Sequence, residues 1–197
     1  ITMAKRAFKL PGVQDLNKDQ DSVLMLPKAG QHLIIGGPGT GKSVVALLRV
    51  MQFRDDNDYI FLVYNKVLET STKQLLENNL KSKTWKWWFF DEVESLINEP
   101  VPKLDQFTPD FDSIISKLEI LSSNNARSLQ LIIDEGQDMP PKFYEAIICM
   151  GIENIFVVAD QNQQLTEQHS NRTELTTALG LEFKDVIELT QNWRNSY

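Results

Sequence analysis

The sequence predicts a three-layer α/β domain in which helices cover both faces of a mostly parallel sheet. Apolar, β-branched runs alternate along the chain with helical patterns, and this order is typical of a parallel sheet. The runs are mostly continuous rather than alternating with polar residues, as expected for strands that are buried on both faces. Ligands of such sheets bind beyond the carboxyl ends of the strands, so a site is expected at that edge.

The individual elements follow from apolar periodicity and from helix-end signals. Strands are expected at His32–Ile35, Tyr59–Tyr64, Leu129–Ile133, Asn154–Ala159 and Asp185–Leu189. Helices are expected at Lys18–Leu26, Lys42–Phe53, Val67–Leu80, Phe111–Leu121, Pro141–Met150 and Arg172–Leu179. Pro141 at a helix start and Gly180 just beyond a helix end are typical of helix termini.

One segment interrupts this regular alternation. Residues 81–104 contain a run of tryptophans and phenylalanines followed by an acidic stretch, and residues 98–110 contain three prolines and are expected to form a loop. We therefore expect a single domain over residues 1–197, with a small insertion at about residues 81–110.

The composition is acidic and poor in cysteine and histidine. The 197 residues carry a net charge of −7 with a pI near 4.9. This balance argues against nucleic-acid binding through a broad basic face but leaves room for a local groove. The single cysteine, Cys149, excludes an internal disulfide and indicates a reducing compartment, so a cytoplasmic location is expected. His32 and His169 are too few for a zinc site, and no apolar run approaches the roughly 18 residues of a membrane span.

A glycine-rich segment between a predicted strand and a predicted helix fits the pattern G-x-x-x-x-G-K-[ST] in full. Its glycines let successive N–H groups point at phosphate oxygens, and the helix that follows adds positive charge at its N-terminus. Lys42 is expected at the β- and γ-phosphates of a nucleotide, and the Ser43 hydroxyl on Mg²⁺. The alternative is a glycine-rich turn that carries Lys-Ser by chance. The residues expected at the nucleotide are Gly36, Gly37, Pro38, Gly39, Thr40, Gly41, Lys42 and Ser43.

Two carboxylates, Asp134 and Glu135, directly follow an apolar strand candidate. In a protein with a phosphate loop, Asp134 is expected to hold Mg²⁺ through water, and Glu135 to orient or deprotonate the attacking water. The alternative is a solvated acidic turn. Asp160 and Arg194 also follow predicted strands, so we expect all of these groups and the phosphate loop at one edge of the sheet.

Five short motifs accompany the phosphate loop. Residues 134–138, Asp-Glu-Gly-Gln-Asp, resemble the D-E-x-Q motif of the superfamily 1 helicases and translocases. The chain is also similar to this family at residues 16–20, 64–66, 157–163 and 189–196, which resemble its L-N-x-x-Q, T-N-K, G-D-x-x-Q and Q-N-Y-R-S motifs. The resemblance spans Leu16 to Ser196. It implies a RecA-like fold, ATP and Mg²⁺ as cofactors, and movement along single-stranded nucleic acid.

The resemblance also implies roles for five further residues at the nucleotide. Gln20 is expected to read the adenine edge, and Trp193 to stack on the base. Gln163 and Arg194 are expected to contact the γ-phosphate and to act in catalysis with Lys42 and Glu135, and Gln137 is expected to lie at the nucleotide. From the residues alone, two alternatives stay open. Gln20 also fits a helix-capping box, and Trp193 equally fits a core anchor.

Lysines and aromatic rings are interleaved at residues 83–90. Stacking of bases on rings, combined with positive charge near the backbone, holds single strands without sequence choice. The alternative is a hydrophobic seam whose lysines extend to solvent, and most of the rings are expected to be core. The residues expected to contact the strand are Tyr64, Asn65, Lys66, Trp85 and Trp87.

The expected function is therefore that of a helicase-type ATPase motor domain that moves on single-stranded nucleic acid, and DNA rather than RNA is the favoured interpretation. Because the family's hydrolytic site lies between two RecA-like domains, we expect this chain to be the first motor domain of a longer protein, and to bind ATP with little turnover by itself. Two other classes remain open: a phosphate-loop enzyme such as a small-molecule kinase, and a nucleotide-dependent switch without motor activity.

Overall fold

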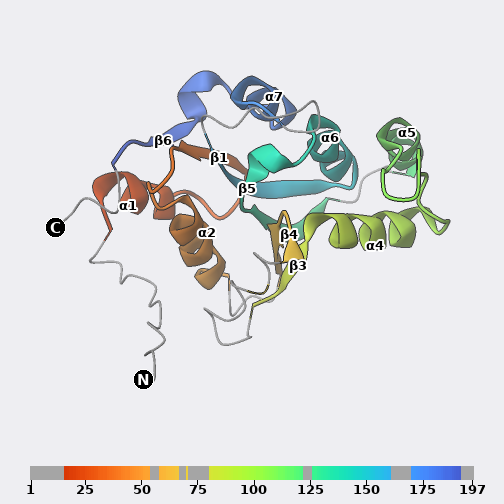
Figure 1. Ribbon diagram of the computed structural model, residues 1–197, viewed down its shortest axis with the longest axis horizontal. Coiled ribbons are helices and arrows are strands. Elements are labelled where there is room, and N and C mark those ends of the chain that lie inside the picture. Colours follow the sequence, from red (N-terminus) through yellow and green to blue (C-terminus); the bar gives the residue numbers. More distant parts are fainter. Residues whose placement is uncertain are drawn as a thin grey trace, which may run out of the picture.

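Within residues 16–53, 58–66, 70, 80–121, 126–160 and 170–191, which the computed structural model describes, six parallel strands form one sheet. The strand order is β3-β2-β4-β5-β1-β6, and every pairing is parallel. The strands are β1 (Gln31–Gly36), β2 (Tyr59–Val63), β3 (Ser82–Thr84), β4 (Arg127–Ile133), β5 (Ile152–Asp160) and β6 (Ile187–Leu189). Figure 1 shows the sheet in the middle of the domain with helices on both sides.

The helices belong to two layers that bury opposite faces of the sheet. Alternate residues of β1 show this division, because Leu33 and Ile35 belong to one apolar cluster and Ile34 to the other. The helices α1 (Lys18–Leu24) and α2 (Lys42–Met51) contribute to the cluster that contains Ile34. The other face is covered by α4 (Trp85–Ile97), α5 (Phe111–Leu121), α6 (Pro141–Cys149) and α7 (Arg172–Ala178). The predicted three-layer α/β fold is confirmed.

Local chemistry explains where several helices begin. The Asn17 side chain accepts a hydrogen bond from the Gln20 N–H at 2.9 Å, and the Gln20 side chain accepts one from the Asn17 N–H at 3.2 Å. This capping box satisfies two of the N–H groups that a helix start leaves without partners. Asn171 and Glu174 form the same arrangement at the start of α7, and Pro141 opens α6. Two short 3₁₀ helices, η2 (Gly136–Asp138) and η3 (Phe183–Asp185), connect other elements.

Where they fall within the described residues, the predicted elements agree with the observed ones to within a few residues, with one segment different. Residues 82–97, which the sequence predicts to be part of an insertion, form the edge strand β3 and the helix α4. In β3 the outer residues Ser82 and Thr84 are buried and Lys83 between them is exposed. Such a three-residue alternation is too short to identify a strand from sequence. The helix expected at Val67–Leu80 lies largely outside the described residues.

A buried arginine joins α2 to the segment between α1 and β1. Arg49 is 0% exposed, and its guanidinium donates to the carbonyl oxygens of Leu26, at 2.9 Å, and Pro27. It also lies over the rings of Phe53 and Phe156, with its central carbon 5.3 and 5.2 Å from the ring centres. Because burial disfavours a charged group, the pKa of Arg49 is lowered, and the two carbonyls offset part of the cost of that burial.

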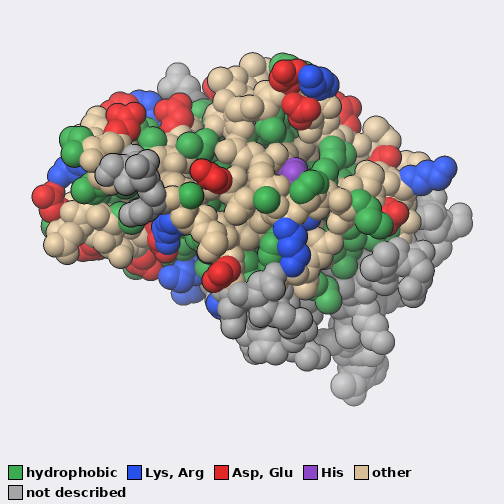
Figure 2. All heavy atoms as spheres, turned by 180° about the vertical axis from the view of Figure 1, so that it is seen from behind, with side chains coloured by type: hydrophobic (Ala, Val, Ile, Leu, Met, Phe, Trp, Pro, Cys, Tyr) green, Lys and Arg blue, Asp and Glu red, His purple; other side chains and the backbone are tan. Residues whose placement is uncertain are grey.

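Charged side chains of both signs lie on the surface (Figure 2), and the single thiol is partly buried. Figure 2 shows acidic and basic side chains interspersed over the face seen from behind, rather than gathered into one basic surface. Cys149, at the end of α6, is partly buried, and this burial raises the pKa of its thiol. Over the described ranges, no helix combines the length and the apolar character that a membrane span requires.

Gly136 allows η2 to pack closely against β5 and α6. A Cβ at this position would lie 2.3 Å from Val157 Cγ1 and 2.9 Å from the Tyr144 hydroxyl oxygen. That hydroxyl donates a 2.6 Å hydrogen bond to the Gly136 carbonyl oxygen, so it cannot easily move away. We predict that Gly136→Ala lowers the free energy of unfolding by about 1–3 kcal/mol through overpacking. Urea denaturation measures the change.

Gly37→Ala is the matched control for this prediction, because a Cβ at Gly37 would meet no atom within 4 Å. Its free energy of unfolding should stay within about 0.5 kcal/mol of wild type. Equal stability losses in the two variants would show that close packing at Gly136 is not the cause.

Candidate active site

The carboxyl edge of the sheet gathers the predicted site residues that are described. β1 leads into the phosphate loop, β4 leads into Asp134 and Glu135, and β5 ends at Asp160. β2 leads into Tyr64. Because all of these strands are parallel, residues that follow them meet at the same edge, as the sequence analysis expects.

The phosphate loop curls tightly between β1 and α2. Gly39 and Gly41 have φ angles of 81° and 86°, in the left-handed region that favours glycine. The Thr40 hydroxyl donates a 2.8 Å hydrogen bond to the Gly37 carbonyl oxygen across the loop. A Cβ at Gly36 would lie only 2.5 Å from the Thr40 hydroxyl oxygen, so this close approach needs glycine there. The loop is therefore preformed as a compact cradle at the start of α2.

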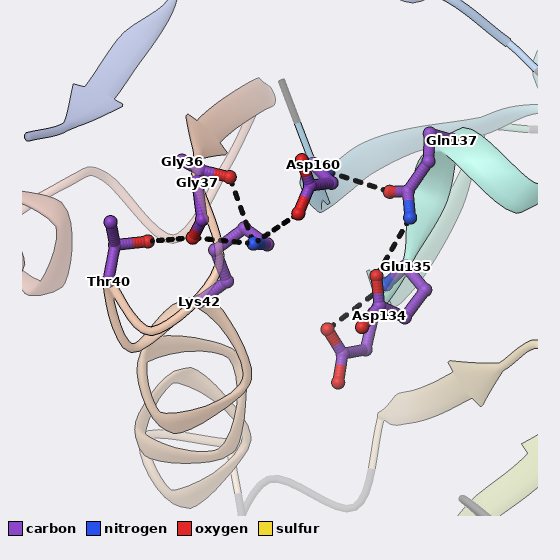
Figure 3. Close-up of polar contacts among 8 residues, drawn as sticks. All are labelled: Gly36, Gly37, Thr40, Lys42, Asp134, Glu135, Gln137 and Asp160. Atoms are coloured by element: carbon purple, nitrogen blue, oxygen red, sulfur yellow. Dashed lines mark hydrogen bonds and ion pairs between the residues drawn. The ribbon is translucent and has the colours of Figure 1, made fainter. Parts of the chain in front are cut away.

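Lys42 lies folded back inside this cradle (Figure 3). Its Nζ donates to the carbonyl oxygens of Gly36 and Gly37 at 2.9 and 3.0 Å, and to Asp160 Oδ2 at 3.1 Å. The side chains of Lys42 and Asp160 are only 9% and 6% exposed. All three ammonium donors thus have partners, which allows a charged group to be buried here.

Asp134 and Ser43 form the second part of the site. Ser43, in the first turn of α2, lies close enough to the Asp134 carboxylate to lower its pKa, although burial has the larger effect. The backbone N–H of Glu135 donates to Asp134 Oδ1 at 3.0 Å. Burial, with a smaller effect of the neighbouring Glu135 charge, raises the pKa of Asp134 from 3.8 to about 6. A buried carboxylate with a perturbed pKa beside a phosphate loop is typical of a functional site.

Glu135 is connected to Asp160 through Gln137. Glu135 has a φ of 54°, a left-handed backbone conformation that is unfavourable for this residue type. Its Oε2 accepts a 2.8 Å hydrogen bond from Gln137 Nε2, and Gln137 Oε1 accepts one from the Asp160 N–H at 2.8 Å (Figure 3). Gln137 is 1% exposed. The two ends of its amide therefore fix the position of the Glu135 carboxylate relative to β5.

Gln20 takes the capping role, one of the two roles that the sequence alone allows. Its Oε1 accepts from the Asn17 N–H, and its Nε2 donates to the Thr40 carbonyl oxygen at 3.0 Å. With 0% exposure, its amide supports the phosphate loop from α1. The preceding residue Asp19 accepts from the backbone N–H and the hydroxyl of Thr190, which hold its pKa below 3.8. Helix α1 thus bridges the loop and the end of β6.

A groove beside the nucleotide edge brings together the five residues expected to contact a single strand. We call it the lysine–tryptophan groove. It has a volume of about 580 Å³ and lies at the carboxyl ends of β2 and β3. Its lining residues are Tyr64, Asn65, Lys66, Lys83, Thr84, Trp85, Lys86, Trp87 and Asp91.

The two tryptophans proposed for strand contact are not equivalent. Trp87 is 73% exposed, whereas Trp85 is 3% exposed and packs edge-on against Phe143 with ring centres 5.2 Å apart. Trp85 therefore anchors α4 in the core, which corrects the expectation that it presents a face for stacking. Trp88 and Phe89 are also buried, as expected for most rings of this segment.

Three predicted site residues cannot be placed, because Gln163, Trp193 and Arg194 lie outside the described residues. Conversely, the contact of Asp160 with Lys42 is a feature of the site that the sequence did not predict. The available signal was the position of Asp160 directly after a predicted strand, in the same motif as Gln163.

The raised pKa of Asp134 predicts a pH-dependent cost to folding. The folded-state pKa of about 6 exceeds the unfolded value of 3.8, so the folded protein binds more protons between these values and loses stability as pH rises through them. We predict that Asp134→Asn raises the free energy of unfolding at pH 7.5 by on the order of 1–3 kcal/mol. The gain should disappear near pH 4. Urea denaturation at both pH values measures it, and a gain that does not change with pH would contradict this cause.

Solved structures with the same fold include Pif1 helicases. The Pif1 helicase from Candida albicans is 16% identical to this chain, with a TM-score of 0.55, over 89% of this chain and 39% of that one. Pif1 from Bacteroides sp, in complex with ADP-AlF4, is 14% identical, with a TM-score of 0.50, over 92% and 43%. The chain thus spans less than half the length of these helicases, and at this identity the likeness establishes the fold alone. No curated protein matches the chain in sequence.

A family model provides the identification. The model described as "Schlafen group 3, DNA/RNA helicase domain" matches residues 31–197, which include every described strand, the phosphate loop and both carboxylates that follow β4. The resemblance to superfamily 1 helicases agrees with this match and with the parallel sheet. The chain therefore belongs to the Schlafen group 3 DNA/RNA helicase domain family, and it has the RecA-like fold of a superfamily 1 helicase domain.

Proposed function

We propose that this domain binds ATP with Mg²⁺ and couples its hydrolysis to movement on single-stranded nucleic acid, with DNA as the expected track. A second RecA-like domain of the same protein completes the hydrolytic site. One observation carries the proposal: the phosphate loop, the Asp134–Glu135 pair and the lysine–tryptophan groove lie on the same carboxyl edge of one sheet. The residues proposed for nucleotide chemistry and those proposed for nucleic-acid contact thus follow β-strands of the same sheet.

The contacts at the loop support phosphate binding with a divalent cation. The curled backbone and the start of α2 suit an anion, and Lys42 supplies a positive charge to the loop. Ser43 and Asp134 fit Mg²⁺, because they present a hydroxyl and a carboxylate oxygen near each other, and this ion prefers oxygen ligands. When bound, Mg²⁺ supplies neutralisation of the charge on the β- and γ-phosphates.

The position of Glu135 supports a role as general base. Its carboxylate follows directly after Asp134 and is oriented by the Gln137 amide. A base of this kind must be held in place to accept a proton from a water molecule. The second domain is proposed to add an arginine, since such a residue is worth 10³–10⁵ in rate in related reactions. The present chain alone is therefore expected to bind ATP with little turnover.

The lysine–tryptophan groove supports contact with a single strand. Lys66, Lys83 and Lys86 give it positive charge within an acidic protein, and Trp87 offers an exposed ring. Lys83 is paired with Asp91 at 3.2 Å, so part of this charge is already compensated. A ring beside several cations is how proteins hold bases and phosphates without sequence choice.

Two variants of the full-length protein test the nucleotide roles. Lys42→Ala should weaken ATP binding by about 10- to 100-fold, since it removes charge-assisted hydrogen bonds to the phosphates. Glu135→Gln should keep ATP affinity and lower kcat by about 10²–10⁴-fold, since it removes only the base. Calorimetry and ATP hydrolysis, with and without single-stranded DNA and RNA, measure both. ATP affinity that does not change in Lys42→Ala would contradict this nucleotide site. ATP hydrolysis that neither single-stranded DNA nor RNA stimulates would argue for a different class of phosphate-loop enzyme.

A third variant tests the groove. Trp87→Ala should weaken single-stranded DNA binding by about 5- to 100-fold, because stacking of one base on a ring contributes about 1–3 kcal/mol. ATP affinity without DNA should not change. Phe183→Ala, which removes a 57% exposed ring on η3 outside the groove, is the matched control and should bind DNA like wild type. Fluorescence anisotropy with a labelled strand measures all three proteins, and equal losses in both variants would contradict the assignment.

A further inference from the structure

Asp160 and phosphate oxygens would make the same contact with Lys42. The ammonium group of Lys42 has three donors, and Gly36, Gly37 and Asp160 accept all three. A phosphate oxygen can bond to Nζ only by replacing one of these acceptors. The two carbonyl oxygens belong to the loop backbone, whereas the Asp160 carboxylate is carried on rotatable bonds. The carboxylate is therefore the acceptor that a phosphate displaces.

The surroundings make this competition strong. The side chains of Lys42 and Asp160 are 9% and 6% exposed, so water and salt screen their interaction only weakly. The pairing register sets Asp160 beside Gly36, so the backbone cannot carry the carboxylate away from the loop. A phosphate that approaches Lys42 thus meets a negative charge of the same sign as its own, which can rotate away from Lys42 but stays near the loop.

The same residue contacts the hydrolytic side of the site. The Asp160 N–H donates to Gln137 Oε1, and Gln137 Nε2 donates to Glu135. A change at the Asp160 side chain therefore occurs one hydrogen bond away from the group that orients the proposed base. Asp160 is placed to connect occupancy of the phosphate loop with the position of Glu135.

We infer that Asp160 is a built-in competitor for the phosphate site, a carboxylate that neutralises Lys42 in the empty protein and must be displaced by the β-phosphate of an incoming nucleotide. This inference rests on the proposed nucleotide function. Asp160 acts through Lys42 as a positioning residue, and it lowers nucleotide affinity rather than raising it. The effect of Asp160 on nucleotide affinity should appear only for nucleotides that carry a β-phosphate.

The test compares the affinity of the full-length wild type and Asp160→Asn for ADP and AMP by calorimetry, in EDTA and again with Mg²⁺. In EDTA, Asp160→Asn should bind ADP roughly 3- to 30-fold more tightly, the scale of one charge-assisted hydrogen bond, with AMP affinity unchanged. Glu188→Gln on β6 is the matched control, because it removes one negative charge on the strand next to β1 and should bind ADP like wild type. Asp160→Ser removes the same charge and is measured in parallel, in case the amide variant does not fold.

Three results would overturn the inference. ADP affinity in EDTA that is unchanged or weaker in Asp160→Asn would show that the carboxylate does not compete with phosphate. Weaker ADP binding only with Mg²⁺ would assign Asp160 to the cation instead. An equal gain in AMP affinity in Asp160→Asn, or an equal gain in ADP affinity in Glu188→Gln, would show that the effect comes from overall charge alone. Wild type that binds no ADP at all would instead refute the proposed nucleotide site itself, which distinguishes the two failures.

Discussion

The parallel pairing of β1 with β5, in the register that sets Gly36 beside Asp160, is the constraint on which the site depends. It brings the Lys42 ammonium group, at the start of α2, and the Asp160 carboxylate together in a space almost closed to water. A slip of one residue would turn Asp160 to the opposite face of the sheet. The register is specified by apolar pairs such as Leu33 with Val157, which are fully buried between the helix layers. The core, rather than the charged groups, therefore determines where the charged groups meet.

Around that register, the polar groups form one connected network. A buried amide, Gln137, joins the ends of β4 and β5, and each of its two ends has a partner. Networks of this kind are stable only when every member is satisfied, because an unpaired polar group in a medium of low dielectric is costly. Asp134 has a hydrogen-bond partner in the Glu135 N–H, but its burial still opposes its charge. A carboxylate held in this state gains more from a bound cation than an exposed one, which is consistent with a site arranged for a ligand rather than for stability.

Sequence reasoning predicts the strands of the site because each is a continuous apolar run between helical patterns. It does not predict β3, whose three residues have no readable period. The two groove tryptophans show a second limit. In a helix that starts at Trp85, side chains rotate by about 100° per residue, so Trp85 and Trp87 point to nearly opposite sides. When the residue at which the helix starts is unknown, the sequence does not distinguish Trp85 from Trp87. The contacts of Gln20 with Thr40 and of Lys42 with Asp160 join distant segments, and no local pattern encodes them.

The buried guanidinium of Arg49 has a consequence for where the domain begins. The family match starts at residue 31, yet two of the carbonyl oxygens that hold Arg49 belong to Leu26 and Pro27. Without those two carbonyls, the Arg49 guanidinium would stay buried between Phe53 and Phe156 but would lose its acceptors from this segment, which is costly for a buried charge. The residues from α1 onward are thus an integral part of the folded unit rather than a linker that leads into it.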